Sequence, residues 1–151
     1  MGTQLTTHFT LEEMTFSETA IRKGIVNEPN NSVLENLLAT TNKMETLRGI
    51  LGNLPIKITS GFRSLDVNSA IGGSGSSAHV RGLAVDFQCP EFGSPKKICQ
   101  ALLGYHDYLD WDQLIHEGGW VHIGWRLADN RGQVLTADFS KKPTGYLEGI
   151  V

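Results

Sequence analysis

The most informative stretch of this sequence is SAHVRGLAVDF, residues 77–87. Its second half is apolar except for Asp86, so we expect a buried strand there. A carboxylate buried in an apolar strand is costly unless a positive charge or a metal ion compensates it. His79 lies seven residues before Asp86, across Gly82, and a loop that enters the strand would bring both side chains to one point. The stretch therefore predicts a polar site at the start of a buried strand.

A second segment, EGGWVH at residues 117–122, offers a third candidate ligand. His122 lies between Val121 and Ile123 in a predicted strand, so its side chain faces the opposite side from theirs. If this strand neighbours the strand of Asp86, the two polar side chains meet across the sheet. Two imidazoles and a carboxylate are good zinc ligands, and three protein ligands leave a fourth position for water, as in catalytic zinc sites.

A zinc hydrolase also needs a base that takes a proton from water and passes it to the leaving amine. Glu117 lies in the turn before the strand of His122 and is our candidate for that base. Arg63 follows a strand on a glycine-containing loop, where it could hold a substrate carboxylate or a developing oxyanion. Ser77 lies two residues before His79 and could bind substrate or orient that ligand.

Each of these residues alone also has an ordinary structural interpretation. Asp86 could be a buried structural acid, Arg63 a loop cation and Glu117 a solvated turn residue. We interpret the remaining histidines as surface or core residues: His8, His106 and His116. The last of these adjoins Glu117 and is the closest alternative ligand.

Composition narrows the class of protein. The 151 residues are 40% hydrophobic and 19% charged, which predicts one soluble domain over residues 1–151, expected to act as a monomer. A net charge of −3 disfavours nucleic-acid binding, and no stretch is long and apolar enough to insert in a membrane. Residues 1–10 lack the apolar segment of a signal peptide, and we expect Cys89 and Cys99 to be a reduced pair.

Periodicity places the elements. We expect helices at residues 10–21 (with a Thr10–Glu13 capping box), 33–51, 65–71 and 94–103. We expect strands at residues 55–60, 83–87, 112–116, 120–125 and 132–139. Helices come first and strands dominate later, which favours an α+β domain.

The residues singled out above also carry a resemblance. The pattern Ser-x-His-x-x-Gly-x-Ala-x-Asp over residues 77–86, the Ser-Gly-aromatic-Arg of residues 60–63 and the later Glu117, Trp120 and His122 resemble a known family. It comprises the zinc D-alanyl-D-alanine carboxypeptidases and dipeptidases and the related phage L-alanyl-D-glutamate endolysins. The matches span about residues 58–125, under half of the chain.

The resemblance implies zinc held by His79, Asp86 and His122, with Glu117 as base and Arg63 binding substrate or stabilising the transition state. It also implies a small α+β fold shared with the hedgehog signalling domain, in which an antiparallel sheet carries the zinc site. The expected substrate is a peptidoglycan stem peptide, cut at a D-Ala-D-Ala or an L-Ala-D-Glu bond.

Two other functions remain open. One is a D,D-dipeptidase that acts on small soluble peptides, and the other is a non-catalytic module stabilised by zinc. Within the leading interpretation we expect a phage or prophage lysis enzyme that waits in the host cytoplasm before release to the periplasm or cell wall. We expect the loops at residues 72–77 and 130–133 to shape the substrate pocket.

Overall fold

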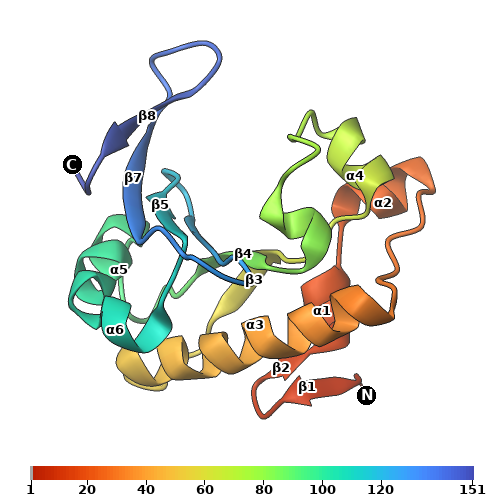
Figure 1. Ribbon diagram of the computed structural model, residues 1–151, viewed down its shortest axis with the longest axis horizontal. Coiled ribbons are helices and arrows are strands. Elements are labelled where there is room, and N and C mark those ends of the chain that lie inside the picture. Colours follow the sequence, from red (N-terminus) through yellow and green to blue (C-terminus); the bar gives the residue numbers. More distant parts are fainter. Residues whose placement is uncertain (1) are drawn as a thin grey trace.

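A computed structural model describes residues 2–151 as an arrangement of short helices around a mixed sheet (Figure 1). The α-helices are α1 (Leu11–Thr15), α2 (Glu18–Lys23), α3 (Asn31–Ile50), α4 (Leu65–Ala70), α5 (Pro95–Leu102) and α6 (His106–Leu109), and the 3-10 helices are η1 (Ala78–Arg81) and η2 (Leu103–Tyr105). The strands are β1 (Gln4–Thr6), β2 (Phe9–Thr10), β3 (Lys57–Ser60), β4 (Ala84–Gln88), β5 (Gln113–His116), β6 (Val121–Gly124), β7 (Gln133–Asp138) and β8 (Gly145–Glu148). The α+β expectation is confirmed.

The large sheet has the strand order β3-β4-β6-β5-β7-β8, and β1 and β2 form a separate hairpin. Every pair in the large sheet is antiparallel except β5 and β7, which run parallel. The sheet is therefore mixed, whereas we expected an antiparallel sheet. The parallel pair arises because the chain crosses over from β6 to the far side of β5. The two strands that carry the candidate ligands, β4 and β6, are antiparallel neighbours at the centre of this sheet.

The two faces of the central strands differ in chemistry. Val121 and Ile123 of β6 are fully buried in the hydrophobic core, and Val85 and Phe87 of β4 lie beside them in register. The intervening residues point to the other face, as strand alternation predicts. This second face therefore presents polar side chains to a space that the helices do not fill.

Helix α3 begins at Asn31, two residues before the expected start, because the Asn30 side chain accepts a hydrogen bond from the Val33 amide and caps the helix. Leu37, Met44 and Leu47 are fully buried, as expected from their spacing. Leu38 follows directly after Leu37 but is 45% exposed. It lies on the solvent side of the helix, one residue beyond the buried face.

The predicted helix at residues 10–21 is two helices. The capping box of Thr10 and Glu13 is present and opens α1. The backbone is extended at Phe16, and the Ser17 side chain then accepts a hydrogen bond from Ala20 N to start α2. The second cap breaks the helix, because a serine side chain that satisfies the amide of a following residue marks a new N-terminus.

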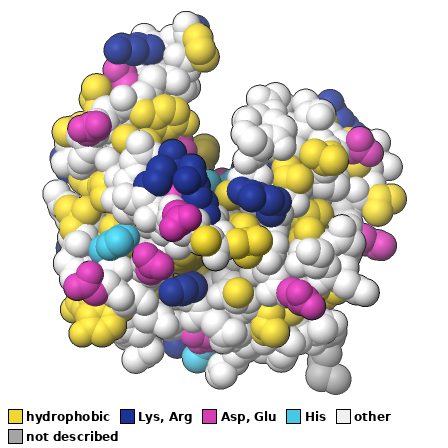
Figure 2. All heavy atoms as spheres, viewed as in Figure 1, with side chains coloured by type: hydrophobic (Ala, Val, Ile, Leu, Met, Phe, Trp, Pro, Cys, Tyr) yellow, Lys and Arg dark blue, Asp and Glu magenta, His cyan; other side chains and the backbone are white. Residues whose placement is uncertain are grey.

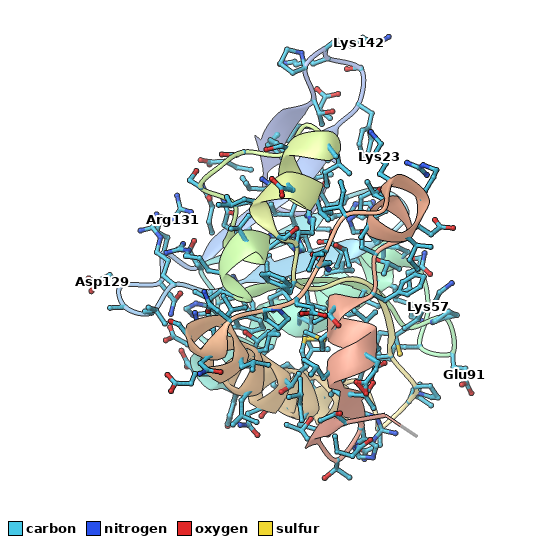
Figure 3. All side chains as sticks on the ribbon, turned by 90° about the vertical axis from the view of Figure 1, so that its right-hand side faces the viewer. Lys23, Lys57, Glu91, Asp129, Arg131 and Lys142 are labelled. Carbon is cyan, nitrogen blue, oxygen red and sulfur yellow. The ribbon has the colours of Figure 1, made fainter. Side chains whose placement is uncertain are left out.

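Figure 1 shows how the helices and strands are arranged around the sheet. The β7–β8 hairpin rises on one side of the sheet, α2 and α4 lie on the other, and α3 runs along the base. Side chains such as Lys23, Lys57, Glu91 and Lys142 point outward from the chain in Figure 3. Over the described residues 2–151, no helix has both the length and the apolar character needed to cross a membrane.

Candidate metal centre and cleft

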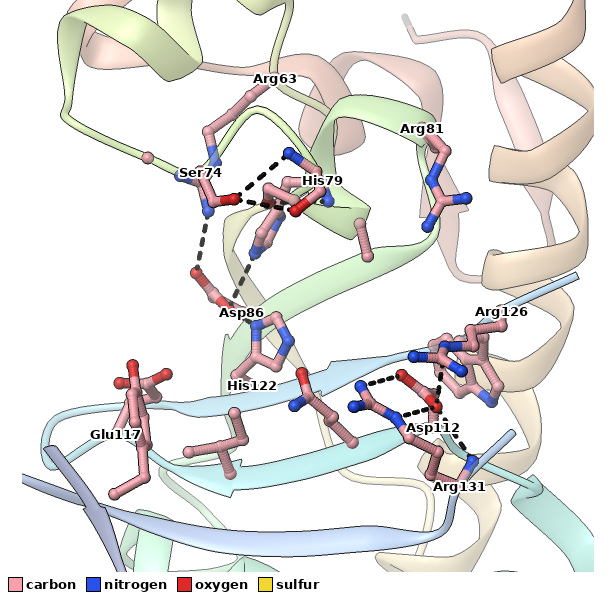
Figure 4. Close-up of a pocket in the computed structure, with 18 of the residues that line it drawn as sticks. Arg63, Ser74, His79, Arg81, Asp86, Asp112, Glu117, His122, Arg126 and Arg131 are labelled. Carbon is pink, nitrogen blue, oxygen red and sulfur yellow. Dashed lines mark hydrogen bonds and ion pairs between the residues drawn. The ribbon is translucent and has the colours of Figure 1, made fainter. Parts of the chain in front are cut away.

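The polar face of the sheet brings three predicted ligands together (Figure 4). Asp86 and His122 are register partners on β4 and β6, and His122 Nδ1 lies 2.8 Å from Asp86 Oδ1. His79, on η1, places its Nε2 atom 3.3 Å from the same oxygen. One ligand atom from each side chain lies within 4.8 Å of the other two, a spacing that one metal ion can bridge.

Local structure fixes the position of His79. The Ser77 side chain accepts a hydrogen bond from His79 N (3.3 Å) and caps η1, so Ser77 orients this ligand. Gly82 ends η1 with a φ of 72°, a left-handed conformation that glycine adopts without a steric penalty. The turn lets the chain pass from His79 directly into β4.

The hydrogen bonds of His79 test whether a metal fits. Its Nδ1 atom lies 2.7 Å from the Gly61 carbonyl oxygen, which can only accept, so Nδ1 carries the proton. In the neutral ring, Nε2 therefore carries a lone pair and no proton. This buried atom has no hydrogen-bond partner among residues 2–151. A lone pair facing the Asp86 carboxylate is unfavourable unless a cation lies between them. The donor set therefore fits a divalent metal, and Gly61 fixes the tautomer as carbonyls commonly do around metal ligands.

Charge at the centre also suits a cation. Burial alone would raise the pKa of Asp86, but the neighbouring His79 and His122 rings outweigh burial and hold this pKa well below its usual range. Burial lowers the pKa of His79, which favours its neutral imidazole. An ionised carboxylate beside a neutral imidazole is the form in which both groups bind zinc.

Arg63 lies three residues after the end of β3, beside the candidate metal centre. Its backbone amide donates a hydrogen bond to the His79 carbonyl oxygen (3.1 Å), and its Nη2 atom lies 3.9 Å from Asp86 Oδ2. Asn68 accepts a long contact from the same guanidinium (3.5 Å) and donates to Ser74 O (2.7 Å). Arg63 therefore has a fixed backbone position and free donor atoms next to the three candidate ligands.

Glu117 follows the last residue of β5, where its amide donates a hydrogen bond to Trp120 O (3.0 Å) and closes the predicted glycine turn. Its carboxylate lines the same cavity and makes no hydrogen bond or ion pair within residues 2–151. Burial raises the pKa of Glu117; the His122 ring opposes this shift and the Asp86 charge adds to it. A partly buried, unpaired carboxylate near a metal centre can exchange a proton with a bound molecule.

The centre lies in an open cleft of about 690 Å³. Both loops that we expected to shape the pocket contribute to its lining: residues 73, 74, 76 and 77 from one, and Arg131 from the other. Figure 2 shows the hollow between the two sides of the molecule. A cleft of this size is large enough for several residues of a peptide.

A family comparison agrees with this geometry. A model of the peptidase M15 family matches residues 7–124, which is more than half of the chain and includes His79, Asp86, Glu117 and His122. The chain belongs to the peptidase M15 family. The zinc D-Ala-D-Ala carboxypeptidase of Streptomyces albus G is 41% identical to it over 51 residues. That alignment covers 34% of the M15 chain and 20% of the relative, so the likeness concerns a minor part of both proteins.

Two features of the M15 cleft were not predicted. Asp112, before β5, holds Arg131 through two contacts of 3.0 and 2.8 Å and lies 3.3 Å from Arg126 Nε. Tyr146 of β8 lines the cleft, and burial raises its pKa, with the Glu117 and Asp86 charges adding to that shift. The sequence signals for these residues were weak, because acid–arginine pairs and single tyrosines are common. Only the fold brings these residues to one cavity.

The other histidines of the M15 chain lie outside the ligand group. His8 Nδ1 contacts Glu45 (2.7 Å), and the His106 ring packs edge-on against Trp111. His116, the closest alternative ligand, is not close enough to join the three side chains that could hold a metal. Cys89 and Cys99 are both free and buried, and burial raises the pKa of Cys99 to about 12, so its thiol stays neutral.

Proposed function

We propose that this chain is a zinc metallopeptidase that hydrolyses peptides of bacterial peptidoglycan, with His79, Asp86 and His122 as zinc ligands. The observation that carries the proposal is the convergence of three ligand atoms within 4.8 Å beside a buried, unpaired His79 Nε2. Membership of the M15 family and the name of the Streptomyces relative support the reaction and the metal. The carboxypeptidase name favours a D-Ala-D-Ala bond, with the L-Ala-D-Glu bond as the alternative.

Each residue of the cleft has a role in this reaction. Zinc held by His79, Asp86 and His122 would supply Lewis acidity and would lower the pKa of a water molecule bound to it. Glu117 accepts the proton of the water that attacks the scissile carbonyl carbon, and gives it to the amine when the C–N bond breaks. Arg63 donates hydrogen bonds to the substrate carboxylate or to the developing oxyanion, because its free donor atoms lie next to the ligands. Ser77 holds His79 in place and lines the cleft, where it can contact substrate.

Two observations separate this function from its alternatives. A non-catalytic zinc module gains nothing from a partly buried carboxylate without a partner, whereas a hydrolase uses such a group as its base, and Glu117 is that group. A dipeptidase encloses a very small substrate, whereas this cleft is open and about 690 Å³ in volume. The first feature favours a catalytic role, and the second favours a substrate longer than a dipeptide.

Digestion of purified peptidoglycan tests the proposal. Zinc-loaded protein is incubated with Gram-negative sacculi, with free D-Ala-D-Ala and with each sample plus chelator, and the products are identified by mass spectrometry. We expect chelator-sensitive release from sacculi, and the new termini name the bond. Hydrolysis of free dipeptide alone would favour the dipeptidase, and no hydrolysis of either by folded, zinc-loaded protein would favour the non-catalytic module.

We further propose that residues 1–151 act as one monomeric domain and as a phage or prophage lysis enzyme. The resemblance of residues 77–86 to phage endolysins and the single hydrophobic core, which joins residues from β2 to Trp125, support this. Expression in a Gram-negative host tests the lysis role. We expect lysis only when a membrane pore is expressed with the protein, so that it passes from the cytoplasm to the wall. Intact cells in that co-expression would contradict it.

A further inference from the structure

Arginines are concentrated in the cleft. Four of the six arginines of the chain line it, whereas none of its seven lysines does: Arg63, Arg81, Arg126 and Arg131. The chain as a whole carries a net charge of −3, so this is a local reversal of charge. The guanidinium group binds planar anions through two parallel hydrogen bonds, which an ammonium group cannot do. Four arginines in one cleft therefore suit an anionic ligand such as a carboxylate.

Three of these arginines form a group apart from Arg63, as Figure 4 shows. Arg126 and Arg131 share Asp112, and Arg81 projects from η1 toward the same end of the cleft. The Arg81 guanidinium makes no hydrogen bond or ion pair with any residue that the structure describes, and the Arg126 and Arg131 side chains are 44% and 45% exposed. Three cations against one carboxylate leave two positive charges at this end. Figure 2 shows Lys and Arg side chains gathered at the hollow.

The strand register gives the distance of this group from the metal centre. Ile115 of β5 is paired with His122, and Asp112 lies three residues before Ile115. At about 3.3 Å per residue, Asp112 is roughly 10 Å along the sheet from the level of the ligands. Glu117 lies on the opposite side of that level, two residues after Ile115. An extended peptide covers roughly 10 Å with three residues.

We propose that Arg81 and Arg126, with Arg131 held by Asp112, form a subsite that binds a carboxylate of the substrate about three residues from the cleaved bond. The proposal rests on the proposed peptidase function. The matched part of the family ends at residue 124, so Arg126 and Arg131 lie beyond it. The two net positive charges attract the substrate carboxylate. The contacts with Asp112 hold the Arg131 side chain in the cleft.

A pair of synthetic stem pentapeptides ending in D-Ala-D-Ala tests the subsite. In one the α-carboxylate of the D-glutamyl residue, three residues before the terminal bond, is free, and in the other it is an amide. Binding of each peptide to the zinc-loaded Glu117→Gln protein is measured by calorimetry, and hydrolysis is measured with the active protein. We expect the free carboxylate to bind roughly tenfold more tightly, the effect of one hydrogen bond between charged groups at an exposed site.

The double variant Arg81→Gln/Arg126→Gln shows whether the arginines cause that preference. We expect it to bind both peptides equally, with KM raised for the free carboxylate and kcat little changed. Arg22→Gln, an exposed arginine of α2 outside the cleft, should keep the tenfold preference. Equal binding of both peptides to the Glu117→Gln protein, or a preference that survives in the double variant, overturns the subsite. A carboxylate preference in binding without any hydrolysis would keep the subsite and reject the proposed peptidase.

Discussion

The Glu117 carboxylate differs from the other acidic side chains of the cleft, because no contact accounts for its position. It is partly buried, it lines the cavity, and no described residue pairs with it. By contrast, Asp86 contacts two imidazoles and Asp112 contacts two arginines. Glu117 therefore has no structural task that explains its position, which is why we assign it the proton transfer.

Substitution of Glu117 by glutamine tests that assignment. The amide keeps the shape but cannot accept the proton, so we expect kcat to fall about one hundred- to ten-thousand-fold, the usual contribution of a general base. Zinc content, measured by atomic emission, should stay at one ion per chain. Glu148→Gln, an exposed glutamate on β8, is the matched control. Unchanged wall-lytic activity in the Glu117 variant would remove our assignment of the base.

The convergence of His79, Asp86 and His122 could be predicted from the sequence, and the arginine group could not. Strand alternation alone sets the side on which His122 lies, and the apolar neighbours of Asp86 mark it as a compensated acid. Arg126 and Arg131 meet Asp112 only because β5 and β6 pair and the following loop returns past them. Such long-range placement leaves no local pattern in the sequence.

The turn between η1 and β4 links the α3 core to the metal centre. A Cβ atom added to Gly82 would lie 3.0 Å from side-chain carbons of both Leu37 and Val33, and the φ of this residue is 72°. The Gly82 carbonyl oxygen also accepts a hydrogen bond from Thr40 (2.8 Å), inside the core. Both the conformation and the packing therefore require glycine.

Gly82→Ala should lower the free energy of unfolding more than the same change at a left-handed glycine that has no close neighbours. Gly24 has a φ of 64° and no atom within 4 Å of an added Cβ, so Gly24→Ala should cost only about 1–2 kcal/mol of conformational strain. Gly82→Ala adds crowding of about 1–3 kcal/mol and should weaken zinc binding as well. Urea denaturation and zinc titration measure both effects. Equal costs for the two variants would mean that the turn does not pack against α3 as described.

The contact between Asp112 and Arg131, in the loop after β6, stabilises the folded protein by an amount that depends on pH. Hydrogen bonds from Arg131 hold the pKa of Asp112 below its ordinary value of 3.8, with burial acting in the opposite direction. The folded pKa is depressed, so this stabilisation is present above pH 3.8 and is lost as the pH falls through the folded pKa.

We therefore expect Asp112→Asn to lower the free energy of unfolding by about 1–2 kcal/mol at neutral pH, since one partner is a half-exposed arginine. The difference between the variant and the unsubstituted protein should shrink as the pH falls below 3.8. Urea denaturation along a pH series measures this, with the exposed Asp107→Asn as control. A difference that stays constant down to the acid limit would show that charge pairing is not its source.

Element prediction was most accurate where a cap or an apolar pattern was strong. Helix α3 and strands β3 to β7 lie within two residues of the expected ranges. The elements missed are short or lie at the edges: β1, β2, η1, η2, α6 and β8. Their formation depends on partners that are distant in the sequence, as when β8 pairs with β7. Short segments have little periodicity of their own, so the sequence alone did not reveal them.

Across the whole molecule, zinc should act as a folding ligand. The three candidate ligands lie on η1, β4 and β6, and an ion that joins them ties the polar face together. At a free zinc concentration 100 times the dissociation constant we expect a stabilisation of about 2.7 kcal/mol, or a rise in Tm of roughly 5–10 °C. Thermal unfolding with and without chelator measures it. His122→Ala should abolish the rise and His8→Ala should keep it; a rise that persists in the first variant contradicts the ligand set.

The central claim is the position of the metal, and anomalous diffraction from a zinc-soaked crystal at the zinc absorption edge tests it most directly. We predict one strong peak, about 2.0–2.2 Å from His79 Nε2, an Asp86 carboxylate oxygen and a ring nitrogen of His122, with its fourth side open to the cleft. A peak held by other side chains, or none at these three residues in crystals that contain zinc, would contradict the account.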